Sequence, residues 1–305
     1  MVRNHYSSLH EAITDIFGSS RTIVSRQSVS GGDINESYVI NLDDGTTLFL
    51  KTNSINSFFD AEAEGLNAIR KTNTVRVPTV LGLGVDSGMS FLLMEFISSS
   101  GQRIKGYWET FAEELSAMHN TDVGSTYGFP HDNWIGTRKQ KNTFFDSWID
   151  FFRDCRLKPQ FDAATNYFSV DEMRKMDWLL EHLDLYLFEP VKPSLVHGDL
   201  WSGNMITGSD GKGWLIDPAV YYGCSEVDIA MTELFGGFSY HFYDVYKQTM
   251  EPGYEDRREL YNLYHLLNHL NIFGSGYLQP VVRIIERYGH LNKSMRFINP
   301  HSECP

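Results

Sequence analysis

Apolar and polar positions alternate in short runs along much of the first hundred residues, as is typical of β-strands. Asp43-Asp44-Gly45 and Asp86-Ser87-Gly88 each separate two of these runs, and both are strong signals for β-hairpins. Helical spacing of apolar positions occurs at the N-terminus, over about residues 1–18, and again over about 57–71. The strands expected in this part of the chain cover residues 22–29, 36–42, 46–51, 79–85 and 90–97.

The pattern changes after Ser98-Ser99-Ser100-Gly101, where helical spacing dominates except for a short strand region around 195–217. The expected helices cover residues 107–119, 143–157, 170–187, 226–235, 239–250 and 257–273. A sheet-rich lobe, a short hinge and a larger helical lobe outline a protein-kinase-like architecture. We therefore predict an α+β, bilobal fold. A small five-stranded antiparallel lobe with one helix, preceded by an N-terminal helix, would span residues 1–97, and a larger, mainly helical lobe 98–305.

Composition and charge narrow the class of protein. The chain has 305 residues and is 42% hydrophobic, which fits a packed globular protein long enough for two lobes. Its formal charge of −13 argues against nucleic acid as a partner but does not exclude a nucleotide carried with magnesium. No run of about eighteen apolar residues occurs, so we expect no membrane span. Three scattered cysteines fit neither a disulfide framework nor a zinc site, and they indicate a reducing cytoplasm.

Candidate chemistry begins at His197-Gly198-Asp199, which follows a short apolar run. Asp199 and Asn204 have the D-x-x-x-x-N spacing of kinase catalytic loops. In such loops the aspartate takes the proton of the acceptor hydroxyl and the asparagine holds Mg²⁺. We identify Asp199 as the candidate catalytic base and Asn204 as a candidate metal ligand. For this segment alone, a turn built from polar residues remains an equal alternative.

A second candidate metal ligand is Asp217. It follows two short apolar runs that flank the turn 209–213, so a hairpin would return it to the catalytic loop. The corresponding aspartate of protein kinases binds Mg²⁺. Pro218 replaces the phenylalanine found there, so we do not expect the conformational switch of regulated kinases. The alternative, an aspartate that caps a turn, is less favoured.

Lys51 closes the third predicted strand, and the helix 57–71 offers it a partner. Glu62 lies on the apolar stripe of that helix together with Phe59 and Leu66. A carboxylate on a buried face requires a cationic partner. We therefore expect an ion pair between Lys51 and Glu62, which would position phosphates. Solvent exposure of both side chains is the alternative.

The remaining nucleotide contacts are expected from the backbone. Gly31 and Gly32 join the first two strands, where kinases carry their glycine-rich loop, although an ordinary hairpin would look similar. The last strand of the small lobe ends with Glu95, Phe96 and Ile97, whose backbone would face adenine. Without the other features, this segment would indicate only a buried strand. The order of all these features along the chain is that of a kinase, which predicts ATP and Mg²⁺ as cofactors.

Longer motifs resemble one family. VHGDLWSGNM (196–205), IDPAVYYG (216–223) and EVDIAMTELFGGF (226–238) are similar to segments of the fructosamine kinase (ketosamine-3-kinase) family. SGGDIN (30–35) and FFDAEAEGLNAIR (58–70) match further segments, so the resemblance covers about nine-tenths of the chain. The family is related to aminoglycoside and choline kinases on the protein-kinase-like fold.

The resemblance implies an ATP-dependent kinase that phosphorylates a hydroxyl of a ketosamine (a fructosamine or ribulosamine), carried by a small sugar-amine or a glycated protein. Phosphorylation at the 3-position makes the adduct unstable and frees the amine, which amounts to deglycation. The resemblance also implies that residues 1–97 bind the nucleotide, that residues 98–305 bind the acceptor, and that Asp228 braces the catalytic loop.

Other acceptors stay open, namely an aminoglycoside, a choline-like alcohol or a sugar metabolite. Cys224 and Ser225 stand where the family often carries His or Asp and Arg, near the presumed acceptor side. Trp201 could stack on a sugar or simply pack against its neighbours. A nucleotide-binding pseudoenzyme is disfavoured, because every residue that the chemistry needs is present. The sequence indicates no oligomeric state.

Overall fold

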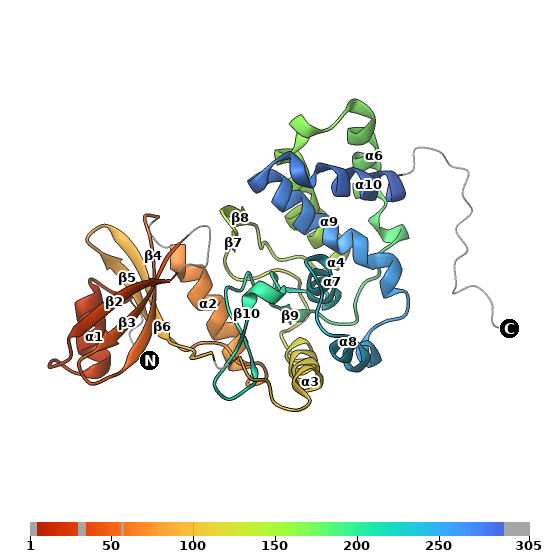
Figure 1. The fold of residues 1–305 in the computed structure, drawn as a ribbon. Coiled ribbons are helices and arrows are strands. Elements are labelled where there is room, and N and C mark those ends of the chain that lie inside the picture. The colour runs from red at the N-terminus through yellow and green to blue at the C-terminus, as the bar shows by residue number, and fades with distance from the viewer. Residues whose placement is uncertain (1–4, 30–34, 56–57, 100, 290–305) are drawn as a thin grey trace.

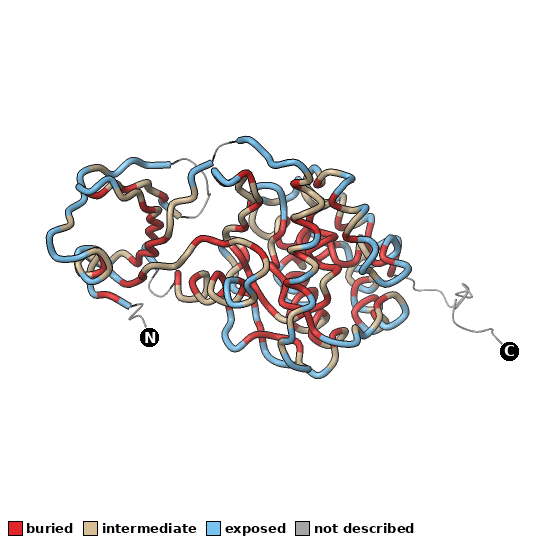
Figure 2. Tube along the Cα trace, turned by 90° about the horizontal axis from the view of Figure 1, so that it is seen from below, coloured by how far each residue is buried: buried red, intermediate tan, exposed pale blue. Residues whose placement is uncertain are grey.

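The computed structural model describes residues 5–29, 35–55, 58–99 and 101–289, which form a small and a larger lobe (Figure 1). Buried segments concentrate inside the larger lobe, whereas much of the outer part of the small lobe is exposed (Figure 2). Within these ranges, no helix has both the length and the apolar character needed to cross a membrane. The two-lobed α+β fold predicted from the sequence is confirmed.

The small lobe is built on one six-stranded sheet with the strand order β1-β5-β6-β4-β3-β2. Its elements are β1 (His5–Tyr6), α1 (Leu9–Phe17), β2 (Ile23–Val29), β3 (Glu36–Leu42), β4 (Thr47–Asn53), α2 (Phe58–Lys71), β5 (Val80–Asp86) and β6 (Met89–Glu95). The five predicted strands are present and pair antiparallel. The prediction missed β1, which pairs with β5 in parallel and, at two residues, is too short to show a periodic pattern.

The two faces of this sheet bury different side chains, because successive residues of a strand point to opposite sides. Leu48 and Leu50 of β4 belong to a hydrophobic cluster with Ile13 of α1. Phe49, which lies between them, packs instead with the cluster that includes α2. Lys51 shares the face of Phe49, so the alternation of β4 directs it towards α2. Figure 1 shows α1 and α2 on opposite sides of the sheet.

Helix α2 connects the small lobe to the larger one. Its apolar stripe is buried as predicted: Phe59, Leu66 and Ile69 are each at most 1% exposed. They belong to the same hydrophobic cluster as the core of the larger lobe. A Cβ atom at Gly65 would lie 3.3 Å from the side chain of Pro218, so the helix packs closely against the segment that follows Asp217.

The larger lobe is mainly helical and contains three two-stranded sheets among its described residues: β7–β8, β9–β12 and β10–β11. Its elements are α3 (Tyr107–His119), β7 (Asn133–Ile135), β8 (Arg138–Gln140), α4 (Trp148–Phe151), α5 (Lys158–Ala163), α6 (Val170–Glu181), β9 (Ser194–Val196), β10 (Met205–Thr207), β11 (Gly213–Leu215), β12 (Tyr221–Gly223), α7 (Glu226–Leu234), α8 (Tyr240–Tyr246), α9 (Tyr254–Phe273) and α10 (Leu278–Tyr288). A π-helical turn, Phe152–Leu157, joins α4 to α5. Short 3₁₀ turns occupy Thr165–Tyr167, Leu183–Leu185, Ser202–Asn204, Lys247–Thr249 and Ser275–Tyr277.

The helices differ from the predictions mainly at their ends. The helix expected from residue 143 begins only at Trp148, where the Ser147 hydroxyl caps it by accepting from the Asp150 N–H. Helix α10 was not expected. Gly274, which ends α9 with a φ of 87°, and Pro280 both suggested that no helix follows. Helix α10 forms nevertheless, because Pro280 lies in its first turn, where proline is tolerated.

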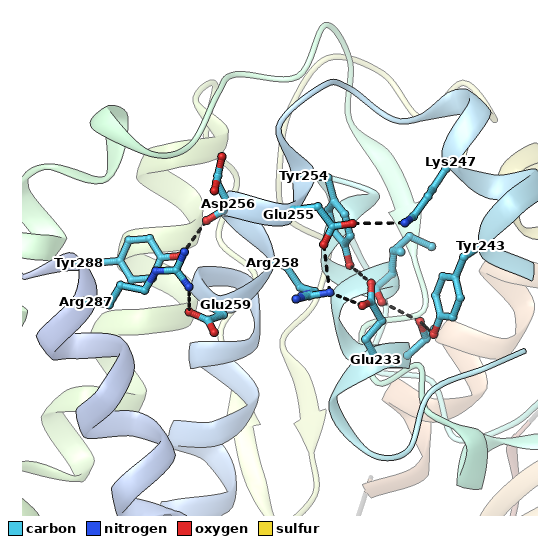
Figure 3. A network of polar contacts seen from close by, with 12 residues as sticks. Glu233, Tyr243, Lys247, Tyr254, Glu255, Asp256, Arg258, Glu259, Arg287 and Tyr288 are labelled. Carbon is cyan, nitrogen blue, oxygen red and sulfur yellow. Dashed lines mark hydrogen bonds and ion pairs between the residues drawn. The ribbon is translucent and has the colours of Figure 1, made fainter. Parts of the chain in front are cut away.

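Helix α9 is the central helix of the larger lobe, and polar contacts fix its first half (Figure 3). The Tyr254 hydroxyl donates to Glu233 of α7 at 2.7 Å, and Arg258 forms an ion pair with the same carboxylate. Arg287 of α10 forms an ion pair with Glu259 at 2.6 Å. The first half of α9 is thus held against α7 and α10, while its second half leads towards the small lobe (Figure 1).

Candidate active site

Lys51 is held between two carboxylates from different lobes. Its Nζ lies 2.7 Å from Oε1 of Glu62 on α2 and also contacts Oδ1 of Asp217 in the larger lobe. Only 7% of the Lys51 side chain and 12% of the Glu62 side chain are exposed. Burial lowers the pKa of Lys51, but the charges of Asp217 and Glu62 outweigh it and raise the pKa above its usual range. The lysine is therefore a stable cation.

Asp217 stands two residues beyond the end of β11, in a backbone conformation that few side chains adopt. Its φ is +55°, in the left-handed region that is uncommon for residues other than glycine. The preceding residue, Ile216, donates its N–H to the carbonyl of Asn204 at 3.1 Å. This bond ties the end of β11 to the catalytic loop and brings Asp217 beside it. Strained backbone of this kind concentrates at functional sites.

The predicted catalytic loop, residues 197–204, begins after β9 with a turn that requires glycine. Gly198 has φ +81°, and a Cβ atom there would lie 2.1 Å from the carbonyl oxygen of Ala219. The carboxylate of Asp228 on α7 accepts the N–H groups of His197 and Gly198 at 2.7 and 2.9 Å. His119 of α3 contacts the same carboxylate at 3.0 Å. Asp228 therefore fixes the start of this loop through the backbone of His197 and Gly198.

Asp199 and Asn204 are joined by direct contacts. The amide nitrogen of Asn204 donates to Oδ2 of Asp199 at 2.9 Å and to its backbone carbonyl at 2.8 Å. Burial raises the pKa of the Asp199 carboxyl to about 7; the bond from Asn204 opposes the shift, and the charges of Asp217 and Asp228 add to it. A carboxylate with a pKa near neutrality is suited to general-base catalysis.

These side chains line one cleft of about 720 Å³ between the lobes. Lys51, Glu62, Asp199, Asn204 and Asp217 all contribute to its wall. The structure thus brings together, from both lobes, five residues that the sequence singled out separately.

The donor atoms in the cleft suit Mg²⁺. The Asn204 amide nitrogen is engaged by Asp199, so its oxygen is the atom that can face a cation, and Asp217 adds a carboxylate. Within the described residues, no three His, Cys, Asp or Glu side chains are grouped as metal ligands. Mg²⁺ does not need such a group, because it commonly combines one or two protein ligands with water and substrate phosphates.

Of the remaining predicted nucleotide contacts, the structure describes only Glu95, Phe96 and Ile97. Gly31 and Gly32 fall outside the described residues. Glu95, Phe96 and Ile97 follow or end β6 and are not among the residues that line the cleft. The carboxylate of Glu95 instead accepts from the backbone N–H and the hydroxyl of Thr79, at 3.0 and 2.7 Å, which fixes the end of the sheet.

The structure also shows where Trp201, Cys224 and Ser225 lie, three residues for which the sequence left the role open. Trp201 lines the cleft, is 36% exposed, and meets the ring of Phe235 edge-on at 6.3 Å. Cys224 is buried and accepts a hydrogen bond from Tyr261 at 3.7 Å. Neither Cys224 nor Ser225 lines the cleft. That these two lie near the acceptor side stays a prediction.

Sequence reasoning missed two parts of the cleft wall. One is the tip of the β7–β8 hairpin, where Trp134 packs on Phe58 of α2 at 5.2 Å between ring centroids. The other is the end of α9, which contributes His269 and Phe273. Their spacing of four residues places both on one helix face. Two aromatic residues on one face at the end of a predicted helix were the signal in the sequence that could have indicated this part of the wall.

Buried amides attach the hairpin to the segment behind Asp217. Asn133 donates to the carbonyl of Val220 at 2.8 Å, and Gln140 donates to the carbonyl of Ala219 at 3.0 Å. The Tyr264 hydroxyl donates to Gln140 at 2.6 Å. Satisfied buried networks of this kind hold one geometry.

Comparisons with known proteins agree with this geometry. The fructosamine kinase family model matches residues 5–291. A "probable ketoamine kinase" of Synechocystis sp. is 38% identical over 92% of this chain and 96% of its own. The chloroplastic protein-ribulosamine 3-kinase of Oryza sativa subsp. indica is 39% identical over 91% and 82%. The crystal structure of a "putative fructosamine-3-kinase" from Haemophilus somnus 129PT superposes with a TM-score of 0.82, at 32% identity, over 93% and 97%.

The family model covers most of the chain, and the sequence relatives and the solved structure each match across both lobes. The chain therefore belongs to the fructosamine kinase family, and it is a phosphotransferase that acts on a hydroxyl group.

Proposed function

We propose that this protein transfers the γ-phosphoryl group of ATP to a hydroxyl of a ketosamine, with Asp199 as the general base. The observation that carries this proposal is the convergence of Asp199, Asn204, Asp217 and the Lys51–Glu62 pair on one cleft. The acceptor class is supported by the names of the relatives, a ketoamine kinase and a ribulosamine 3-kinase.

The reaction would proceed as an in-line displacement. The carboxylate of Asp199 takes the proton of the acceptor hydroxyl while that oxygen bonds to the γ-phosphorus. The bond from phosphorus to the bridging oxygen breaks, ADP leaves, and Asp199 later returns its proton to water. A phosphate at C3, next to the C2 carbonyl of the ketosamine, would favour elimination and release of the amine.

The other residues would position the donor. Lys51, charged and held by Glu62, would contact phosphate oxygens, and Asn204 with Asp217 would hold Mg²⁺. Bound Mg²⁺ would neutralise charge that develops on the transferred phosphoryl group. The hydrogen bonds from His197 and Gly198 to Asp228 would hold the backbone that leads to Asp199 in place.

We assign nucleotide binding to residues 1–97 and acceptor binding to 98–305. Gly31 and Gly32 would cover the phosphates, and the backbone of Glu95, Phe96 and Ile97 would meet adenine. Support comes from their position on the small lobe, where kinases hold the nucleotide.

The acceptor would be either a small sugar-amine or a glycated protein. We also place the activity in a reducing compartment such as the cytoplasm, because Cys155 and Cys224 are buried free thiols.

The test is ADP release by the purified protein with ATP and Mg²⁺. The acceptors are fructosyl-lysine, ribulosyl-lysine, a set of aminoglycosides and choline, with the Asp199→Asn variant as control. We expect turnover on the ketosamines only. Turnover restricted to aminoglycosides or choline would refute the ketosamine assignment, and equal rates for the control variant would refute the role of Asp199.

A further inference from the structure

We propose that Arg156 is a positioning residue for the metal site: it directs a buried chain of hydrogen bonds that holds the segment after Asp217 in place. This inference rests on the proposed function, because it takes Asp217 as a ligand of Mg²⁺. Arg156 lies in the core of the larger lobe and is not among the described residues that line the cleft. Its effect on the reaction therefore passes through other residues.

The guanidinium group of Arg156 is buried without a counter-ion. The side chain is fully buried, and it forms no ion pair with any carboxylate of the described residues. Its Nη1 donates to the carbonyls of Lys141 and Cys155 at 2.6 and 2.9 Å, and its Nη2 donates to Oδ1 of Asn142 at 2.7 Å. The guanidinium carbon lies 3.9 Å from the ring centroid of Tyr221. A buried charge without an opposite charge costs free energy, so core filling alone does not explain an arginine at this position.

An unusual backbone turn presents Arg156 to the core. It belongs to the π-helical turn Phe152–Leu157, which joins α4 to α5. Turns of this kind are rare and often occur at functional sites. From this turn, Arg156 reaches Lys141 and Asn142, the two residues that follow strand β8.

Arg156 determines the direction of the hydrogen bonds that follow, because a guanidinium group donates and cannot accept. Asn142 must turn its side-chain oxygen towards Arg156, so its amide nitrogen faces the other way and donates to Oδ1 of Asn133 at 3.0 Å. The amide nitrogen of Asn133 in turn donates to the carbonyl of Val220 at 2.8 Å. Each amide is thus held in one of its two possible orientations.

The chain of hydrogen bonds ends on the segment that carries Asp217. Gln140 donates to Oδ1 of Asn133 at 2.8 Å and to the carbonyl of Ala219 at 3.0 Å, so two consecutive carbonyls of this segment are held. The N–H of Ala219 donates to the carbonyl of His197 at 2.8 Å. The segment is therefore fixed from two sides. Support of this kind keeps Asp217 in its unfavourable conformation, with a φ of +55°.

The first experiment measures metal binding without an acceptor. Mn²⁺ is titrated into the ADP complex in place of Mg²⁺, and electron paramagnetic resonance follows the free ion. Asp217→Asn tests the proposed ligand and should weaken binding. Arg156→Met removes the donors but keeps a long side chain, and it should raise the Kd for Mn²⁺ about tenfold. Unchanged binding by Asp217→Asn would overturn the proposed metal site as well as this inference. Weakened binding by Asp217→Asn alone would overturn only the inference.

A second variant separates the positioning role from stability. In Asn142→Asp, the new carboxylate accepts from Arg156 and gives it a counter-ion, so the melting temperature should not fall. The carboxylate cannot donate to Asn133, so the chain of hydrogen bonds is interrupted. We expect the Kd for Mn²⁺ to rise about tenfold in this variant too. A Kd equal to that of the wild type would refute the inference, whether or not Arg156→Met folds.

Arg257→Met is the matched control, because it removes another arginine that is buried in the same lobe. Arg257 is 8% exposed, but its contacts are Glu226 and the carbonyls of Glu251 and Pro252. We expect the Kd for Mn²⁺ to stay within about twofold of the wild type, since none of these groups belongs to the chain of hydrogen bonds from Arg156. A rise as large as that of Arg156→Met would show that the metal site responds to any loss of stability, and the inference would fall.

Discussion

At the scale of single residues, the surroundings of Asp199 determine the proton affinity of its carboxylate. Asp199 is partly buried, receives the Asn204 amide, and lies near two further carboxylates, Asp217 and Asp228. Each of these features acts on the proton affinity of one side chain.

The Asp199→Asn variant should lose catalysis but keep nucleotide binding. The amide cannot accept the hydroxyl proton, so we expect kcat to fall about 10²–10⁴-fold. The KM for ATP should stay within about twofold, because Lys51 and Asp217 are untouched. Steady-state kinetics measure both values. A parallel collapse of ATP binding would assign Asp199 to the donor site instead.

The pKa of Asp199 predicts the pH dependence of the reaction. In the proposed mechanism the carboxylate form of Asp199 is the base, so kcat/KM should fall as the pH drops through the pKa of about 7. A cation held by the neighbouring Asp217 would favour the charged form, so this acid limb should move to lower pH as Mg²⁺ is raised. A profile that is flat between about pH 5.5 and 8 at low Mg²⁺ would contradict this assignment.

Gly198 should be intolerant of a side chain for two reasons, its positive φ and the carbonyl of Ala219. We expect Gly198→Ala to lower the free energy of unfolding by about 3 kcal/mol, since strain and overpacking each cost about 1–3 kcal/mol. Urea unfolding measures the loss. Gly236→Ala is the control, because Gly236 has φ +97° with open space around it, and it should show the strain alone.

The residue-level pattern predicted the Lys51–Glu62 contact, because a carboxylate on a buried stripe needs a cation. It could not predict that Lys51 also contacts Asp217, since that contact depends on how the two lobes meet. The pKa of Asp199 is likewise raised by burial, which depends on how distant segments pack, and further by the charges of Asp217 and Asp228.

At the scale of elements, strands bounded by clear turns were predictable. The turn between β5 and β6 carries Ser87 and Gly88, both with positive φ, as a two-residue hairpin of type I′ requires. The short strands β1 and β7 were missed because two or three residues are too few for a period to appear. The equally short β10 and β11 were expected, because a clear turn lies between them.

The buried ion pair between α7 and α9 should matter far more than ion pairs at the surface. Arg257 Nη2 lies 2.6 Å from Glu226 Oε1, with 10% and 3% of the two side chains exposed. Arg257→Met should cost about 3–5 kcal/mol of unfolding free energy, because it leaves a buried carboxylate unpaired. Lys158→Met breaks an exposed pair with Asp162 and should cost less than about 1 kcal/mol. Similar losses in both variants would contradict this account.

At the scale of the whole molecule, contacts across the cleft connect the two lobes. The Lys51–Asp217 ion pair and the packing of Trp134 against Phe58 both join the small lobe to the larger one. The lobes also share a hydrophobic cluster through α2. The position of α2, and with it Glu62, therefore depends on the larger lobe.

Trp134→Ala should weaken this connection without touching the catalytic loop. An aromatic pair contributes about 0.5–1.5 kcal/mol, so we expect KM for ATP to rise by up to about tenfold. Hydrogen exchange in α2 should become faster. Trp178→Ala removes a ring that does not line the cleft, and it should leave both readouts unchanged. Unchanged exchange in α2 of Trp134→Ala would argue against the coupling.

Helix α9 carries a consequence for the evolution of the fold. Its first half is anchored by the ion pairs of Figure 3, whereas His269 and Phe273 at its other end face the cleft and are only partly buried. Substitutions at that end cost little folding free energy. Under the proposed function, a few substitutions on one helix could therefore change this wall of the cleft, while Asp199, Asn204 and Asp217 on other segments stay unchanged.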